Sequence, residues 1–302
     1  MADMDGIQVS GLVNADDSVS VLEEAAALWS SSYPERSFSC VLSAFDAIRS
    51  LFCGEYPGYH ACDTDYHDFR HTLAVFLASF RLLDGYNQVQ APLDAADAQA
   101  LAIAALFHDT GYIRAAGEEA GTGARYTSCH VERSVRFVLG NAAALGINNP
   151  QGIARLIWST GLDNEFARQT WVSQAERDAA CMLASADLVG QMADRIYLEK
   201  LLFLYYEFKE AGFPGYDTEF DILRKTIGFY ELTIARLDGH LGGFRSFARH
   251  HFRKRYGIDR DLYAEAMERQ MAYLQDILAD SSTNFRRKLK RLDLETVGAR
   301  TA

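Results

Sequence analysis

Apolar residues recur at intervals of three and four along most of this 302-residue chain. The clearest example runs from Phe38 to Phe52, with apolar residues at positions 38, 41, 42, 45, 48, 51 and 52. This spacing puts the apolar side chains on one face of an α-helix, so it predicts an amphipathic helix that ends near Gly54. No stretch of useful length alternates polar and apolar residues as a half-buried strand does. The sequence therefore predicts an all-α fold.

The same pattern predicts further helices up to about residue 280. They span about 20–30, 38–53, 66–83, 94–107, 127–145, 150–160, 174–212 with one break, 218–239, 244–255 and 260–280. We expect a flexible N-terminus over 1–16, one helical domain over 17–280 and a basic C-terminal tail over 281–302. The basic cluster from Arg286 to Arg291 is most simply a solvated or frayed helix, with an anion or partner site as the alternative.

Composition excludes several classes of function. The formal net charge of −11 argues against general binding to nucleic acid or to anionic membranes, because both depend on excess Lys and Arg. The five cysteines are scattered without CxxC spacing, so they predict neither a disulfide framework nor a thiolate zinc site. The acidic N-terminus lacks a secretory pattern, and no apolar run is long enough to span a membrane. We therefore expect a cytoplasmic protein.

Histidines and carboxylates stand at unusual places in these predicted helices. His67 and His71 are four residues apart, so on one helix both imidazoles would point to the same side. His108 and Asp109 end a helix of small and apolar residues, where unpaired polar groups are costly. Asp187 lies inside another apolar run. Mixed imidazole and carboxylate groups suit divalent ions such as Zn, Fe, Mn or Mg.

Each of these residues also has a simpler structural explanation. The imidazole of His108 could bond only to the neighbouring carboxylate of Asp109, and Asp187 could be a buried residue bonded to a serine or to the backbone. His130 begins the next predicted helix, where it could be an ordinary surface residue. The joint presence of all these groups favours a metal site over any of the single explanations.

The set formed by His71, His108, Asp109 and Asp187 resembles the metal motif of the HD-domain metal-dependent phosphohydrolase superfamily. The resemblance covers about residues 60–192 and implies a helical bundle with extra helices at both ends. It implies that these four residues hold the first of one or two divalent metal ions, and that Asp109 bridges to the second.

Further segments resemble the cyclic-nucleotide phosphodiesterase branch of that superfamily. Residues 66–71, Tyr-His-Asp-Phe-Arg-His, resemble its YHNxxH signature, and residues 159–162 and 186–188 resemble its later threonine segment and its last metal-binding aspartate. The resemblance implies that a metal-activated hydroxide attacks phosphorus and that His67 protonates the leaving alkoxide as a general acid.

This chain also departs from the pattern of that branch. Tyr112 stands where the phosphodiesterases often place another histidine, and Thr160 lies about where the fuller six-ligand pattern expects one. No histidine occurs between His130 and His240, so His130 is the candidate protein ligand for a second metal. Asp68 replaces the asparagine of the signature, and no counterpart of the purine-selecting glutamine is found.

These features predict a metal-dependent phosphohydrolase that hydrolyses a phosphodiester in a nucleotide or a related small phosphoester. The alternatives are a nucleotide phosphomonoesterase, a nucleotide-binding module with a degenerate site, and an HD-type iron oxygenase, which would need the complete ligand set. The expected partner is the small phosphoester, and a homodimer is one of the states that the sequence allows. Arg114 and Arg125 flank a glycine-rich loop and could contact phosphate, although solvated arginines are the simpler explanation. Residues after about 195 carry no motif and are expected to close one side of the pocket.

Overall fold

The computed structural model describes residues 7–118, 120–162, 166 and 169–294. Its α-helices in chain order are α1 (Ser18–Ser32), α2 (Ser39–Phe52), α3 (Phe69–Val89), α4 (Ala95–Phe107), α5 (His130–Asn141), α6 (Pro150–Trp158), α8 (Gln174–Met192), α9 (Tyr197–Glu210), α10 (Glu219–Asp238), α11 (Phe247–Tyr256) and α12 (Leu262–Ala279). Its 3-10 helices are η2 (Val9–Gly11), η3 (Thr110–Tyr112), η4 (Gly123–Tyr126), η5 (Phe244–Ser246) and η6 (Phe285–Arg287). No β-strand forms within the described residues, so the all-α prediction is confirmed.

Helix α3 lies at the centre of the fold. It packs against α1, α4, α8 and α11, and most of its side chains are buried for that reason. The approach of α11 requires Gly85, because a Cβ atom there would lie 1.9 Å from the carbonyl oxygen of Phe247. Most of α3 from His71 to Tyr86 is therefore enclosed by neighbouring helices.

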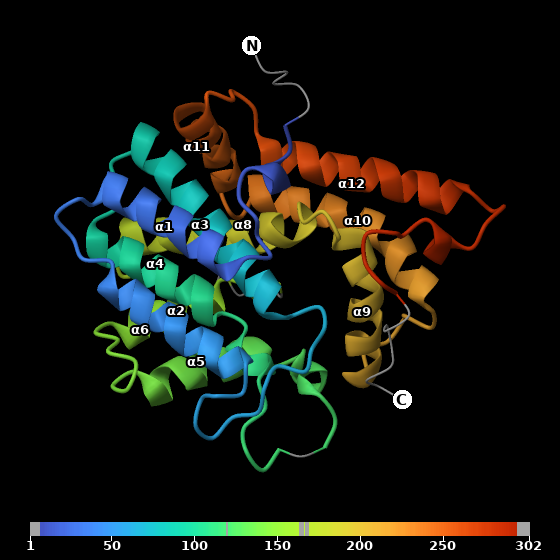
Figure 1. Ribbon diagram of the computed structural model, residues 1–302, viewed down its shortest axis with the longest axis horizontal. Coiled ribbons are helices and arrows are strands. Elements are labelled where there is room, and N and C mark those ends of the chain that lie inside the picture. The colour runs from blue at the N-terminus through green and yellow to red at the C-terminus, as the bar shows by residue number, and fades with distance from the viewer. Residues whose placement is uncertain (1–6, 119, 163–165, 167–168, 295–302) are drawn as a thin grey trace.

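The remaining helices form two groups around α3 and α8. Helices α2, α4, α5 and α6 lie together on one side, whereas α9, α10 and α12 pack together on another (Figure 1). Helix α8 contacts members of both groups, because it packs against α4 and α6 as well as α12. Helix α8 therefore connects the two groups. No helix in the described part of the chain is long and apolar enough to cross a membrane.

Polar side chains cap the starts of several helices. The side chain of Asn149 accepts a hydrogen bond from the backbone of Gly152 and caps α6, which begins at Pro150. The side chain of Ser173 likewise accepts from the backbone of Glu176 at the start of α8. Local polar residues therefore fix these two helix starts, which lie where the predicted helices begin.

The described parts of both terminal segments are more ordered than predicted. Val9 is buried in the core, and the guanidinium of Arg70 forms an ion pair of 2.5 Å with Asp16, so the described N-terminal residues are packed rather than loose. In the described part of the tail, the short 3-10 helix η6 forms, and Arg286 pairs with Glu219 of α10. The outermost residues of both predicted segments lie outside the described chain.

Candidate metal centre

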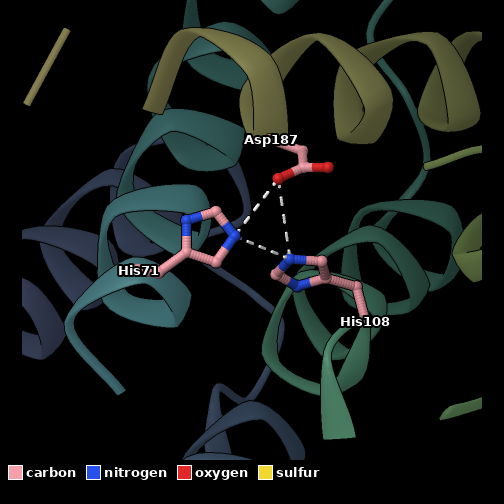
Figure 2. A group of neighbouring side chains, drawn as sticks. All are labelled: His71, His108 and Asp187. Atoms are coloured by element: carbon pink, nitrogen blue, oxygen red, sulfur yellow. Dashed lines mark hydrogen bonds and ion pairs between the residues drawn. The ribbon is translucent and has the colours of Figure 1, made fainter. Parts of the chain in front are cut away.

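Three helices bring the central residues of the predicted motif to one point. His71 lies in the first turn of α3, His108 caps the C-terminus of α4, and Asp187 lies in α8. These three helices pack against one another in every pair. Figure 2 shows that the three side chains point toward one another. One possible ligand atom from each lies within 4.8 Å of the others, so all three can reach a single ion.

The distances within this group match a shared ion better than direct hydrogen bonds. The Nε2 atom of His71 lies 3.2 Å from Nε2 of His108 and 3.2 Å from Oδ1 of Asp187. Oδ2 of Asp109 lies 3.2 Å from the same two nitrogen atoms. Ligands held about 2.0–2.2 Å from one ion stand about 3.0–3.4 Å from their neighbours around it.

The orientation of His108 leaves its inward nitrogen free to bind a cation. Its Nδ1–H donates to the carbonyl oxygen of Ala105 at 2.9 Å, so Nε2 carries a lone pair in the neutral ring. His130 is held in the same way, because its Nδ1–H donates to the carbonyl oxygen of Thr127 at 2.7 Å. Such backbone contacts commonly orient imidazoles that bind metals.

Asp109 joins the cluster to His130. It is 4% exposed, and its Oδ2 atom is buried without a hydrogen-bond partner among the described residues. Its other oxygen, Oδ1, lies 3.7 Å from Nε2 of His130. Buried acceptors that face one another are costly unless a cation lies between them. The residues present can therefore hold one divalent ion, and His130 lies beside one of them.

The local backbone needs a glycine to bring His130 this close. A Cβ atom on Gly111 would lie 1.9 Å from the carbonyl oxygen of His130. The backbone N–H of Gly111 donates to the hydroxyl of Ser134 on α5 at 2.8 Å. The turn after Asp109 is thus in direct contact with the first turns of α5.

The electrostatics of the cluster favour added positive charge. Burial lowers the pKa of His71, but its contacts with Asp109 and Asp187 outweigh burial and raise that pKa to about 10. Burial raises the pKa of Asp109, yet the charge of nearby His108 and the close approach of His71 hold that pKa well below its ordinary value. A bound divalent cation would satisfy the same demand for positive charge.

His67 differs from the prediction, because it does not lie on the helix of His71. Helix α3 begins at Phe69, and Asp68 is its N-cap, whose Oδ1 atom accepts from the backbone N–H of His71 at 2.9 Å. The prediction that His67 and His71 share one helical face is therefore wrong. His67 instead donates from Nδ1 to Oε2 of Glu207 at 2.6 Å.

Glu207 and Lys200 of α9 are the residues that the sequence argument missed. Glu207 is buried, and its Oε1 atom also accepts from the backbone N–H of Tyr66 at 2.7 Å. Lys200 is buried and donates to Asp68 at 2.8 Å, which neutralises the aspartate that replaces the asparagine of the signature. Their charges within the apolar sequence of α9 could have indicated a buried role, but the sequence does not show which residues they contact.

Tyr112 and Thr160 occupy the two positions where further histidines were expected. The Tyr112 ring stacks on both neighbouring imidazoles, 4.1 Å from the ring centre of His67 and 4.6 Å from that of His130. Burial raises the pKa of Tyr112 well above its ordinary value, so its hydroxyl stays protonated. The Thr160 hydroxyl donates to the carbonyl oxygen of Ile157, which directs it to the backbone instead of the cluster.

The two loop arginines considered as phosphate ligands are both held by protein groups. Arg114 pairs with Asp63 at 2.8 Å and also donates to the carbonyl oxygen of Glu118. Arg125 donates to the carbonyl oxygen of Ala120. These contacts support the structural explanation of both residues.

Comparison with known proteins gives one family match. A family model described as Npun_R2479-like matches residues 117–237, which is less than half of the chain. The matched segment includes Asp187 and Glu207 but not the residues of α3 and α4 that complete the cluster. No curated protein and no solved structure matches this chain.

Proposed function

We propose that this chain is a metal-dependent phosphohydrolase that cleaves a phosphodiester bond in a nucleotide or a related small phosphoester. The observation that carries the proposal is the convergence of His71, His108, Asp109 and Asp187 in a buried cluster. The bare Oδ2 atom of Asp109 and the inward lone pair of His108 support a divalent cation as the missing partner. Zn, Fe, Mn and Mg all remain compatible with these ligands.

The four residues of the cluster would hold the first ion, and Asp109 with His130 would contact a second. When bound, such ions activate water as a nucleophile and neutralise charge on the phosphoester. The chain itself supplies a surrounding of apolar helices that limits competing contacts with solvent. His71 and His108 are 5% and 1% exposed, so both imidazoles act inside this enclosed environment.

His67 is the residue proposed to handle the proton. Glu207 holds its Nδ1–H, so the ring is fixed in orientation. Nε2, which lies 3.4 Å from the hydroxyl of Tyr112, is the ring nitrogen that remains for proton transfer. The His67 side chain is 15% exposed, unlike the imidazoles of the cluster, so a substrate group can approach it. A leaving alkoxide is a strong base and needs a proton, which a positioned imidazolium can supply.

The phosphodiesterase-like branch is supported by the segment that contains His67. Helix α9 forms hydrogen bonds with three consecutive residues of this segment. Glu207 bonds to Tyr66 and His67, and Lys200 bonds to Asp68. The replacement of asparagine by Asp68 is therefore compatible with a fixed general acid, because the added negative charge has its own cation.

A panel of phosphoesters tests this proposal directly. The purified protein is supplied with Mn, Mg, Fe or Zn and assayed on bis(4-nitrophenyl) phosphate, 4-nitrophenyl phosphate and cyclic and linear nucleotides. We expect hydrolysis of diesters, its loss in His71→Ala and Asp109→Ala, and its retention in His240→Ala, a control at an exposed histidine.

The outcomes separate the alternatives. Diester hydrolysis that survives His71→Ala and Asp109→Ala would show that the proposed site is wrong. Cleavage of monoesters alone would identify a phosphomonoesterase. Stoichiometric metal binding without turnover on any phosphoester would favour the nucleotide-binding module. The observation that favours this alternative is that Thr160 stands where a further histidine was expected.

A further inference from the structure

An arginine-lined hollow lies away from the candidate metal centre. It is formed by the N-terminal segment, the α8–α9 connection and the C-terminal tail, and its volume is about 520 Å³. The residues that line it are Ile7, Gln8, Ser10, Gly11, Arg195 and Arg291. None of them belongs to the cluster of imidazoles and carboxylates. Its size falls within the range of pockets that hold small molecules.

A smaller hollow of about 80 Å³ adjoins the first one. Both are lined by Arg195 and Arg291, and the smaller one adds Arg269 of α12. Three arginines from separate parts of the chain therefore line these adjoining hollows. None of the described residues that line either hollow is Asp or Glu, although the chain carries a net charge of −11. The lining of the hollows is therefore positively charged, whereas the whole chain is negatively charged.

The guanidinium groups keep donors available for a ligand. Arg195 has no carboxylate partner among the described residues, and Arg269 reaches Glu265 only at 3.4 Å. Arg291 donates from Nη1 to the carbonyl oxygen of Arg195 at 2.7 Å, a contact that orients the side chain without neutralising its charge. All three side chains are exposed, so a dissolved ligand can reach them.

The backbone around the hollow is fixed by buried groups. The side-chain amide of Gln270 donates to the carbonyl oxygens of Asp194 and Arg195 at 2.6 and 3.2 Å. The tail is anchored by buried Leu289, and the backbone N–H of Arg291 donates to Glu199 at 3.1 Å. The basic tail is therefore folded against α9 and α12, with one of its arginines held at the hollow.

We propose that this hollow binds a small molecule that carries two or more phosphate groups. Planar guanidinium groups match phosphate oxygens with paired hydrogen bonds, and three of them can share more than one phosphate. A single phosphate would leave part of this charge unused. This site is independent of the proposed hydrolytic function, because it shares no lining residue with the metal cluster.

Calorimetric titration of the full-length, metal-loaded protein tests the inference. The probe is methylenediphosphonate, whose P–C–P linkage cannot be hydrolysed, and inorganic phosphate serves as the single-phosphate comparison. We expect Arg195→Ala and Arg269→Ala each to weaken diphosphonate binding by about tenfold or more. Arg195→Lys should recover part of the loss, because it restores charge but not the paired donors. Inorganic phosphate should bind much more weakly than the diphosphonate.

A matched control and a site control make the result decisive. Arg249→Ala removes an exposed arginine that pairs with Asp259 and should leave binding unchanged. Asp109→Asn removes any binding of the diphosphonate at the metal cluster, and the binding that remains should still depend on Arg195 and Arg269. The inference is overturned if the wild type shows no binding, if Arg195→Ala and Arg269→Ala bind normally, or if binding is lost in Asp109→Asn alone. Circular dichroism and diester hydrolysis of the arginine variants confirm that they remain folded.

Discussion

Two places in this fold bury histidine against aspartate, and they do so with different geometry. His251 of α11 donates from Nδ1 to Oδ2 of Asp84 on α3 at 2.8 Å. The candidate metal cluster is more open. The Nε2 atoms of His71 and His108 lie 3.2 Å or farther from the carboxylate oxygens of Asp109 and Asp187. The first arrangement is a closed pair, whereas the second is a ring of groups around a common point.

The difference shows how a structural pair can be told from a ligand set. Asp84 also accepts from the side chain of Gln88 and pairs with the ammonium of Lys254 at 3.4 Å, so its charge is satisfied by the protein. Oδ2 of Asp109 is buried and has no such donor among the described residues. Burial lowers the pKa of His251, which keeps that ring neutral, whereas the carboxylates raise the pKa of His71 to about 10. Only the second environment calls for an additional cation.

A third arrangement lies between these two. His67 and Glu207 form a direct hydrogen bond of 2.6 Å, as a structural pair does, but the His67 side chain is 15% exposed. A fixed imidazole with an accessible nitrogen suits proton transfer better than metal binding. Substitutions in each of the three arrangements test whether they differ in this way.

The largest effect is expected from replacing the two aspartates in parallel. Asp109→Asn should lose stoichiometric metal and lower diester hydrolysis by more than about 100-fold, because changes in the groups that merely support metal ligands already cost 10–100-fold. Asp84→Asn should keep both metal and activity, because Asp84 contacts no member of the cluster. Elemental analysis and initial rates on the same preparations measure this. Equal metal content in both variants would remove the distinction between the two regions.

The next effect concerns the proton donor. His67→Gln should lower kcat by about 100-fold or more on a substrate with an alkoxide leaving group, while metal content stays unchanged. The loss should be much smaller with a 4-nitrophenolate leaving group, which needs no proton. Glu207→Gln should give the same pattern with a smaller loss, because the ring keeps a weaker acceptor. An identical loss for both leaving groups would contradict the general-acid role.

Metal removal should lower the Tm of protein that keeps Asp109 and should not lower the Tm of Asp109→Asn. A ligand present at 100 times its Kd stabilises a protein by about 2.7 kcal/mol, so a chelator should lower the Tm by about 4–8 °C. The chelator should cause the same shift in Asp84→Asn and no shift in Asp109→Asn. Differential scanning calorimetry with and without added metal gives the comparison. A chelator shift that persists in Asp109→Asn would place the metal elsewhere.

The smallest effect is a pH dependence carried by His251. Because burial lowers its folded pKa, the unfolded chain takes up the proton first, and stability is lost as pH falls through about 6.5. This loss cannot exceed about 1.4 kcal/mol per pH unit for one group. His251→Asn should show a shallower fall in unfolding free energy between pH 7 and pH 5 than the wild type, with chelator present throughout. His240→Asn, at an exposed position, is the control and should keep the wild-type slope.

The sequence determined the helical class, the positions of several helix starts and the four residues that meet in the cluster. It also contained the correct local signal at Asp68, which caps α3, but the spacing of His67 and His71 suggested a helix that begins too early. A capping side chain acts over three residues and outweighs a periodicity that extends beyond it. This error was therefore a conflict between two local signals.

Only the tertiary structure decided which distant residues complete each site. Glu207 reaches His67 across 140 positions of sequence, and Lys200 reaches Asp68 across 132. The same holds for the arginine-lined hollow, where chain segments from both ends meet. Helix periodicity and capping depend on neighbours a few residues away and can be followed in the sequence. Contacts between helices depend on how whole apolar faces pack, and that packing brings α9 to the segment that contains His67.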